Sequence, residues 1–206
     1  MATIAIDMDD VLNNLMPTWL QAYNRDYEDT CGPANIADWD VWKHVKPVCG
    51  TKIYDYHTPE LFLACSPMPG AQRVTQELIE DGHDLMVVSA CWHPENEAAK
   101  RQWLGKHFPW LKQDRCHFLP KGREKCEHRA DVLIDDGLHN FTGWPSGTIG
   151  LVFDQPWNQV DGDSYGIPVL RVFNWPHIRD LFEDYDAACP FSRYMQRMDT
   201  VKRATF

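Results

Sequence analysis

A short apolar run near the amino terminus that ends in acidic residues constrains the fold of this chain more than any other feature. Residues 4–10 read IAIDMDD. An uninterrupted apolar run is typical of a parallel strand that is buried on both faces. Open α/β sheets bind their ligands at the carboxyl ends of such strands. The sequence therefore predicts a buried strand at residues 3–7 that places Asp7 and Asp9 at a binding edge.

Carboxylates crowded at one edge need a partner that balances their charge. They repel one another unless a cation lies among them, and Mg²⁺ prefers oxygen ligands. We interpret Asp7 and Asp9 as part of a Mg²⁺ site in which one acid stays free for chemistry. A surface turn rich in aspartate is the alternative interpretation, because so short a motif also arises by chance.

The size and charge of the chain exclude several classes of protein. Its 206 residues suit one domain with a modest insertion. Thirty acidic residues against twenty basic ones argue against binding of a nucleic-acid polymer, because such binding needs a basic face. A small phosphorylated ligand is compatible with this charge, since a metal ion and one or two local cations can hold its phosphate.

The sequence shows no feature of a membrane protein or of a disulfide-bonded one. No apolar run approaches the ~20 residues of a membrane helix, and the first strand begins without a leader segment. The seven cysteines are odd in number and scattered, which is typical of reduced thiols. We therefore expect a cytoplasmic protein without membrane contacts.

Strands and helices alternate along the rest of the chain. Apolar runs predict strands at 84–89, 117–119, 130–134, 149–153 and 169–173. Helical patterns predict helices at 71–81, from Pro94 to Leu104, and at 176–187. Such alternation is typical of βαβ units. We expect an α/β fold, namely a Rossmann-like three-layer core with a mostly parallel sheet.

One segment interrupts this alternation. A helix begun by Pro17 and a polar, aromatic-rich stretch without strand signals lead up to a boundary at residues 67–70, which read PMPG. We predict a small helical cap at 16–66, inserted after the first strand, over a core formed by 1–15 and 67–206. The mildly basic tail beyond Ala188 forms either a short helix or a loose segment.

Three further features coincide with the ends of predicted strands. Ser89 ends one strand, and its hydroxyl and the backbone N–H groups just beyond it, beginning with Ala90, can bind phosphate oxygens. Asp135 and Asp136 end another strand, where a hard cation can use them. Lys125 precedes that strand and can neutralise a phosphate. The alternatives are an ordinary strand-end serine, a turn or helix cap, and a solvated lysine.

Two pairs of residues suggest a different metal. Cys116-His117 and Cys126-x-His128 offer four zinc ligands. Their spacing matches no common zinc ribbon or finger. A structural zinc site is therefore a weaker hypothesis than the Mg²⁺ site.

These motifs together resemble a known superfamily. Asp7-x-Asp9, Ser89, Lys125 and Asp135-Asp136 look like the four-motif set of the haloacid dehalogenase-like phosphatases. Within that superfamily the chain resembles the 5'(3')-deoxyribonucleotidase family, including its bacterial and phage members. The similarity covers roughly residues 3–185 and is carried by the segments 6–12, 67–71, 123–125, 133–136, 153–158 and 171–175.

The resemblance implies a phosphomonoester hydrolase with an aspartyl-phosphate intermediate. Asp7 would be the nucleophile and Asp9 the general acid and base. The Asp7 carboxylate, the Asp9 carbonyl and the acidic pair would hold Mg²⁺, with Asp136 favoured over Asp135 as the direct ligand. The residues that would grip the phosphate are Ser89, Ala90 and Lys125, with Lys121 as the rival lysine.

The resemblance also implies a nucleotide substrate, with Trp39, Trp42 and Tyr56 as candidates to contact the base. Leu15 stands where relatives often carry an aromatic residue, and Gly137 stands where some carry arginine, so the nucleotide preference stays open. A homodimer is compatible with such a chain. The alternatives are a phosphatase of another small phosphomonoester, such as a sugar phosphate, and a non-catalytic nucleotide-binding protein.

Overall fold

The computed structural model describes residues 1–206 except positions 92, 121, 160–164, 184, 186–190 and 192–206. Except for Phe191, the tail beyond Ala188 lies outside the described residues, as do residues 184, 186 and 187 of the helix predicted at 176–187.

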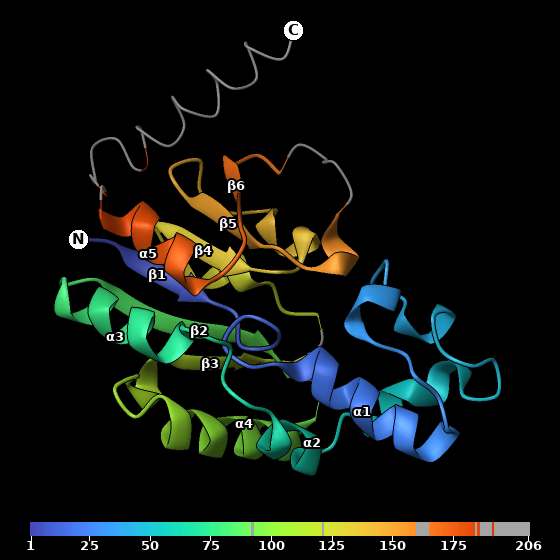
Figure 1. The fold of residues 1–206 in the computed structure, drawn as a ribbon. Helices are drawn as coiled ribbons and strands as arrows, with labels where there is room; N and C mark the ends of the chain where they lie inside the picture. The colour runs from blue at the N-terminus through green and yellow to red at the C-terminus, as the bar shows by residue number, and fades with distance from the viewer. Residues whose placement is uncertain (92, 121, 160–164, 184, 186–190, 192–206) are drawn as a thin grey trace, which may run out of the picture.

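The centre of the structure is a six-stranded sheet in the order β3-β2-β1-β4-β5-β6 (Figure 1). All five strand pairings are parallel. This order reverses direction beside β1, which is the place where α/β sheets form a ligand-binding crevice. The strands are β1 (Thr3–Ile6), β2 (Asp84–Ala90), β3 (Cys116–Leu119), β4 (Val132–Asp135), β5 (Ile149–Phe153) and β6 (Val169–Val172).

The two faces of the sheet pack into separate cores. Ile4 and Ile6 of β1 belong to the larger core, while Ala5 between them belongs to the smaller one. The larger core includes buried residues of α3 (Ala71–Glu80), α4 (Pro94–His107) and α5 (Trp175–Glu183). The smaller core lies under the short 3-10 helix η6 (Leu138–Phe141) and neighbouring loops. The α/β, Rossmann-like fold with a parallel sheet is therefore confirmed.

The part of the connection between β1 and β2 that runs from α1 to α2, before α3, consists of helices and 3-10 turns and lies at one end of the sheet (Figure 1). Trp19 in its first helix donates a hydrogen bond to the Ile53 carbonyl, and Trp103 of α4 donates one to the Cys65 carbonyl. These bonds join the segment to itself and to the core, but its division from the core as a cap at 16–66 stays a prediction. Its elements are α1 (Leu15–Tyr27), η1 (Pro33–Asn35), η2 (Val41–Lys43), η3 (Gly50–Tyr56) and α2 (Pro59–Ala64).

Helix α1 begins at Leu15, two residues before the proline that was expected to begin it. Pro17 lies in the first turn instead, where the missing N–H costs nothing because the first N–H groups of a helix have no partner inside the helix. Among the described residues, no helix has both the length and the apolar character needed to cross a membrane.

Candidate active site

The loop that follows β1 is tightly turned. The Asp7 N–H donates to the Ile134 carbonyl at 2.9 Å, so β1 and β4 stay paired up to this residue. Asp10 then adopts a left-handed conformation with a φ of 56°, which aspartate tolerates better than most residues. Its carboxylate accepts a hydrogen bond from the Met16 N–H at 2.8 Å. Asp10 therefore turns the chain from β1 into α1.

Three carboxylates converge beyond the ends of β1 and β4. Oxygen atoms of Asp7, Asp135 and Asp136 lie within 4.8 Å of one another, and all three residues are buried. Burial, followed by the charges of neighbouring aspartates, raises the pKa of Asp136 well above its ordinary value. Burial also raises the pKa of Asp135, although Lys125 opposes that shift. Such a cluster favours a cation.

Lys125 supplies part of that charge balance. It begins the 3-10 helix η5 (Lys125–His128) and is buried. Its Nζ donates to Asp135 Oδ2 at 2.6 Å and lies 2.9 Å from Asp7 Oδ1. Burial alone would lower the pKa of Lys125, but the charges of Asp135 and Asp7 outweigh burial and raise it. Its rival Lys121 lies outside the described residues.

The acidic cluster offers an unpartnered oxygen to a divalent cation. The ion pair with Lys125 does not have hydrogen-bond geometry at Asp7 Oδ1, so this buried oxygen has no hydrogen-bond partner among the described residues. A buried, unpartnered carboxylate oxygen beside two further carboxylates is a donor set that suits Mg²⁺.

The two acids of the pair differ in how many donors surround them. Asp135 accepts hydrogen bonds from Lys125, from the Gly137 N–H at 2.8 Å and from Asn140 Nδ2 at 2.9 Å. The Asp136 carboxylate accepts one bond, from Trp157 Nε1 at 2.8 Å to its Oδ2. Asp136 therefore keeps more free lone pairs for a metal than Asp135 does.

Gly137 explains one departure from the expected family pattern. A Cβ at this position would lie 2.7 Å from Asn140 Nδ2 and 2.9 Å from His139 Cε1. A larger side chain would therefore push Asn140 away from Asp135, which that amide helps to orient.

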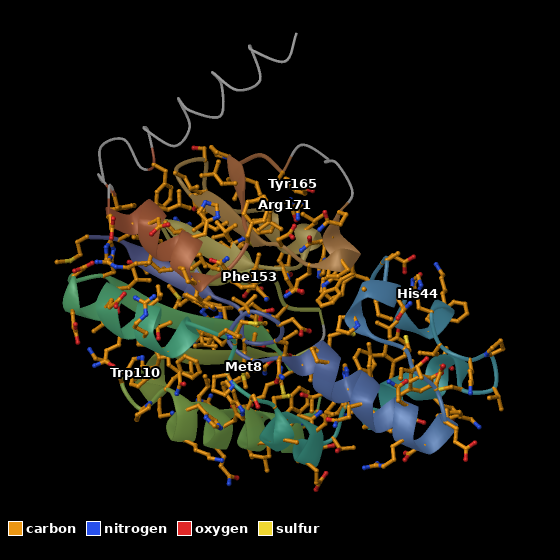
Figure 2. All side chains as sticks on the ribbon, in the orientation of Figure 1. Met8, His44, Trp110, Phe153, Tyr165 and Arg171 are labelled. Carbon is orange, nitrogen blue, oxygen red and sulfur yellow. The ribbon has the colours of Figure 1, made fainter. Side chains whose placement is uncertain are left out.

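Residues after β5 and on β6 fix the backbone of Asp136 through hydrogen bonds. Asn158 Nδ2 donates to the carbonyls of Asp136 and Phe153, both at 2.8 Å. Arg171 binds Asn158 Oδ1 and Asp154 Oδ1, each at 2.8 Å. Figure 2 labels Phe153 at the end of β5 and Arg171 on β6, and Asn158 ends the 3-10 helix η7 (Pro156–Asn158) that follows β5. The sequence offered these residues only as part of a resemblance, without a role.

Ser89 lies on the other side of β1, at the end of β2, and is buried. Its Oγ accepts a hydrogen bond from Lys100 Nζ at 3.2 Å, and the Ala90 carbonyl accepts one from the same atom at 2.8 Å. Lys100 Nζ also lies 2.5 Å from Asp9 Oδ2.

Sequence reasoning missed Lys100, which lies in the helix predicted from Pro94 to Leu104. One signal was available: Lys100 lies three and four residues before Trp103 and Leu104 and therefore on the same helix face. A lysine on an apolar face is a candidate for a buried role.

The three candidate base-contacting aromatics have different described partners. Trp39 is exposed and packs edge-on against Trp157, with ring centroids 6.2 Å apart, so it lies beside the residue that binds Asp136. The described ring contact of Trp42 is with the Lys43 ammonium. The Tyr56 hydroxyl donates to Asp26. Described contacts connect only Trp39 to the acidic cluster.

The zinc hypothesis fails in the described part of the chain. There the only group of three or more clustered acidic, histidine or cysteine ligands is the one at Asp7. Cys116 Sγ donates to the Lys112 carbonyl, Cys126 Sγ contacts Glu124, and the rings of His117 and His128 stack on each other.

Comparison with known proteins gives consistent results. A family model described as "5' nucleotidase, deoxy (Pyrimidine), cytosolic type C protein" matches residues 1–186. The chain is 32% identical to the 5'(3')-deoxyribonucleotidase of Bacillus subtilis (strain 168) over 176 residues, which cover 85% of this chain and 95% of that one. It is 34% identical to the 5'(3')-deoxyribonucleotidase of Clostridium acetobutylicum over 145 residues, which cover 68% and 78%.

Solved structures share the fold at low identity. A putative beta-phosphoglucomutase from Thermotoga maritima has a TM-score of 0.55 at 14% identity and covers 89% of this chain and 99% of its own. A HAD family hydrolase from Deinococcus radiodurans R1, with bound phosphate and sodium, has a TM-score of 0.53 at 15% identity and covers 90% and 96%. With this fold and these relatives, the chain belongs to the 5'(3')-deoxyribonucleotidase family of phosphomonoester hydrolases.

Proposed function

We propose that this protein is a Mg²⁺-dependent 5'-nucleotidase that hydrolyses (deoxy)ribonucleoside monophosphates to nucleoside and phosphate. The observation that carries the proposal is the buried convergence of Asp7, Asp135 and Asp136 around Lys125 at the ends of β1 and β4. Family membership supports the substrate class, because the relatives named above are deoxyribonucleotidases.

The Asp7 and Asp136 carboxylates and the Asp9 carbonyl would hold Mg²⁺. Asp136 is the better direct ligand because Asp135 already accepts three hydrogen bonds. Asp135 would then fix Lys125. When bound, Mg²⁺ neutralises negative charge on the phosphoryl group and on the carboxylates around it.

Asp7 would begin the reaction as a nucleophile. One of its carboxylate oxygens attacks phosphorus, and the bond between phosphorus and the nucleoside oxygen breaks. The electron pair of that bond goes to the leaving oxygen, which takes a proton from Asp9. The products of this step are the nucleoside and an aspartyl-phosphate on Asp7.

Asp9 would then act in reverse. It takes a proton from a water molecule that attacks phosphorus, and the bond from phosphorus to Asp7 breaks. The electron pair returns to Asp7, so the free carboxylate is restored. Phosphoryl transfer depends mainly on alignment and charge neutralisation. The groups that would supply these are Lys125, the Ser89 hydroxyl and the Ala90 N–H.

The substrate base would lie near Trp39, the one candidate with described contacts toward the acidic cluster. Trp42 and Tyr56 stay weaker candidates on the same segment, and residues 16–66 would act as the cap. The six described cysteines are all free thiols, which supports the proposed cytoplasmic location. The homodimer stays a prediction.

A substrate panel tests this function. Phosphate release is measured from nucleoside 5'- and 3'-monophosphates and from sugar phosphates, each with Mg²⁺ and with a chelator. We expect turnover of nucleoside monophosphates that stops on chelation and returns with added Mg²⁺. Equal or faster turnover of sugar phosphates would reject the proposed nucleotidase function. Turnover that is unaffected by chelation would reject the proposed Mg²⁺ requirement.

A further inference from the structure

Both oxygens of the Asp9 carboxylate are held by side chains from different elements. Asn13 Nδ2 donates to Oδ1 at 3.1 Å, and Lys100 Nζ donates to Oδ2 at 2.5 Å. The Asn13 side chain is itself fixed, because its Oδ1 accepts hydrogen bonds from the backbone N–H groups of Asp10 and Leu15. Each Asp9 oxygen keeps a second lone pair for a proton.

Each of the three N–H donors of the Lys100 ammonium group has an acceptor within reach. Lys100 is almost fully buried on α4, and its ammonium group has three donors. The described structure offers three acceptors within reach: Asp9 Oδ2, Ser89 Oγ and the Ala90 carbonyl. The ammonium also lies 4.7 Å from the centre of the Phe62 ring. Lys100 is therefore a fixed link rather than a mobile surface cation.

These contacts also affect Ser89. Since its Oγ accepts a hydrogen bond from Lys100, the hydroxyl proton is left to be donated elsewhere. A serine at the end of β2 that donates its proton is what binding of a phosphate oxygen needs.

If the side chain at position 100 served only packing, an apolar residue would fill the site without the energetic cost of burying a charge. Burying an ammonium group is unfavourable unless it is paired, and well-packed apolar side chains often replace buried ion pairs without loss of stability. Lys106 on the same helix is exposed, which is the usual position for a lysine.

We propose that Lys100 is a positioning residue of the hydrolytic reaction: it holds the Asp9 carboxylate in place for proton transfer and orients the Ser89 hydroxyl for phosphate binding. This inference rests on the function proposed above. The effect of Lys100 on Asp9 can be measured separately in the two reaction steps, because Asp9 acts as an acid in the first step and as a base in the second.

The test compares two substrates with Lys100→Met and a matched control, Lys106→Met. p-Nitrophenolate is a good leaving group and departs without an acid, whereas the nucleoside oxygen needs a proton. Hydrolysis of the aspartyl-phosphate needs Asp9 as base with either substrate. Rapid-mixing experiments at saturating substrate, with Mg²⁺, measure the two steps separately.

We expect a selective loss in Lys100→Met. With p-nitrophenyl phosphate, a burst of p-nitrophenolate equal to the enzyme concentration forms at a rate within about threefold of wild type, and steady-state turnover then falls ~100-fold. With a deoxyribonucleoside 5'-monophosphate, formation of nucleoside falls ~100-fold and shows no burst. Asp9→Asn gives the same pattern, and Lys106→Met behaves like wild type.

Other outcomes overturn the inference. Unchanged rates in Lys100→Met, or equal loss of the burst and of later turnover in a folded variant, would show that Lys100 does not act through Asp9. If Lys100→Met does not fold, Lys100→Arg is measured instead, because its rigid fork cannot reach all three acceptors. It should show the same pattern with a smaller loss, and wild-type rates in both steps would refute the inference. A wild-type protein inactive on every nucleoside monophosphate would instead refute the proposed function.

Discussion

The carboxyl edge of the sheet and the aromatic segment beside it differ in how they are built. At the edge, Asp7 and Asp135 are buried, and each is tied to Lys125. In the segment between β1 and β2, Trp39 and Trp42 are 44% and 41% exposed and stand on or near short 3-10 turns. The buried, charge-paired edge suits the chemical step, whereas the exposed aromatic side chains suit recognition of a variable substrate group.

The strongest challenge to this comparison is removal of the nucleophile. We expect Asp7→Asn to lower phosphate release by ~10⁴-fold or more, because no other described carboxylate occupies its place at the end of β1. Asp55→Asn, at an exposed aspartate of η3, is the control and should keep wild-type rates. Rates in Asp7→Asn above a tenth of wild type would place the chemistry elsewhere.

His57 tests whether the segment from α1 to α2 is firmly packed. Burial, with smaller effects of Lys100 and His93, lowers the pKa of His57 from 6.5 to about 4. The unfolded chain therefore binds a proton that the folded protein does not, so stability is complete above pH 6.5 and decreases as the pH falls toward 4. The full loss is ~3 kcal/mol.

Urea unfolding at pH 7 and at pH 5 measures this contribution. His57→Phe should reduce the difference in unfolding free energy between the two pH values, because its ring also fits beside Trp19 and Phe62 but does not titrate. The same difference in wild type and in His57→Phe would mean that His57 is solvated and the segment is open.

Trp157 tests whether Asp136 is a Mg²⁺ ligand at the carboxyl edge of the sheet. Removing its hydrogen bond to Asp136 by Trp157→Phe should weaken Mg²⁺ binding ~10–100-fold, since partners of metal ligands orient them. Titration of phosphate release with Mg²⁺ gives the half-saturating concentration. Trp110→Phe removes an indole hydrogen bond to Thr75 on α3, away from the acidic cluster, and is the matched control (Figure 2 labels Trp110). Equal Mg²⁺ requirements in both variants would contradict a ligand role for Asp136.

The smallest effect is expected at the aromatic segment. Trp39→Ala should weaken binding of a nucleoside monophosphate by about 1–3 kcal/mol, which raises KM. We expect kcat to change little, because stacking on the base binds the substrate and does not take part in the reaction. Trp42→Ala is the comparison, since its described ring contact is with Lys43. A larger effect on KM from Trp42 than from Trp39 would reverse our assignment of the base site.

The edge of the sheet could be predicted from sequence because its signals are local. Burial on both faces makes β1, β4 and β5 nearly uninterrupted apolar runs, so β5 at 149–153 has the bounds expected and β1 ends beside Asp7. The carboxyl ends of parallel strands meet in space whatever the distance between them along the chain. The convergence of Asp7 and Asp136 follows from that geometry alone.

Lys100 and His57 could not be predicted in the same way. The helix face that Lys100 shares with Trp103 and Leu104 indicates burial, but only the folded structure shows that its partner is Asp9. His57 lies in a segment of short 3-10 turns without a repeating pattern. Its half-buried position depends on contacts with Trp19 and Phe62, which come from two different helices.

The central claim is that Asp7, Asp136 and Lys125 surround one divalent ion and one phosphate. A crystal structure of the protein with Mg²⁺ and inorganic phosphate tests this claim most directly. We predict Mg²⁺ at about 2.0–2.1 Å from oxygens of Asp7 and Asp136, with the phosphate between Asp7, Ser89 and Lys125. Mg²⁺ or phosphate bound away from these side chains, with the acidic cluster held together by Lys125 alone, would contradict the account.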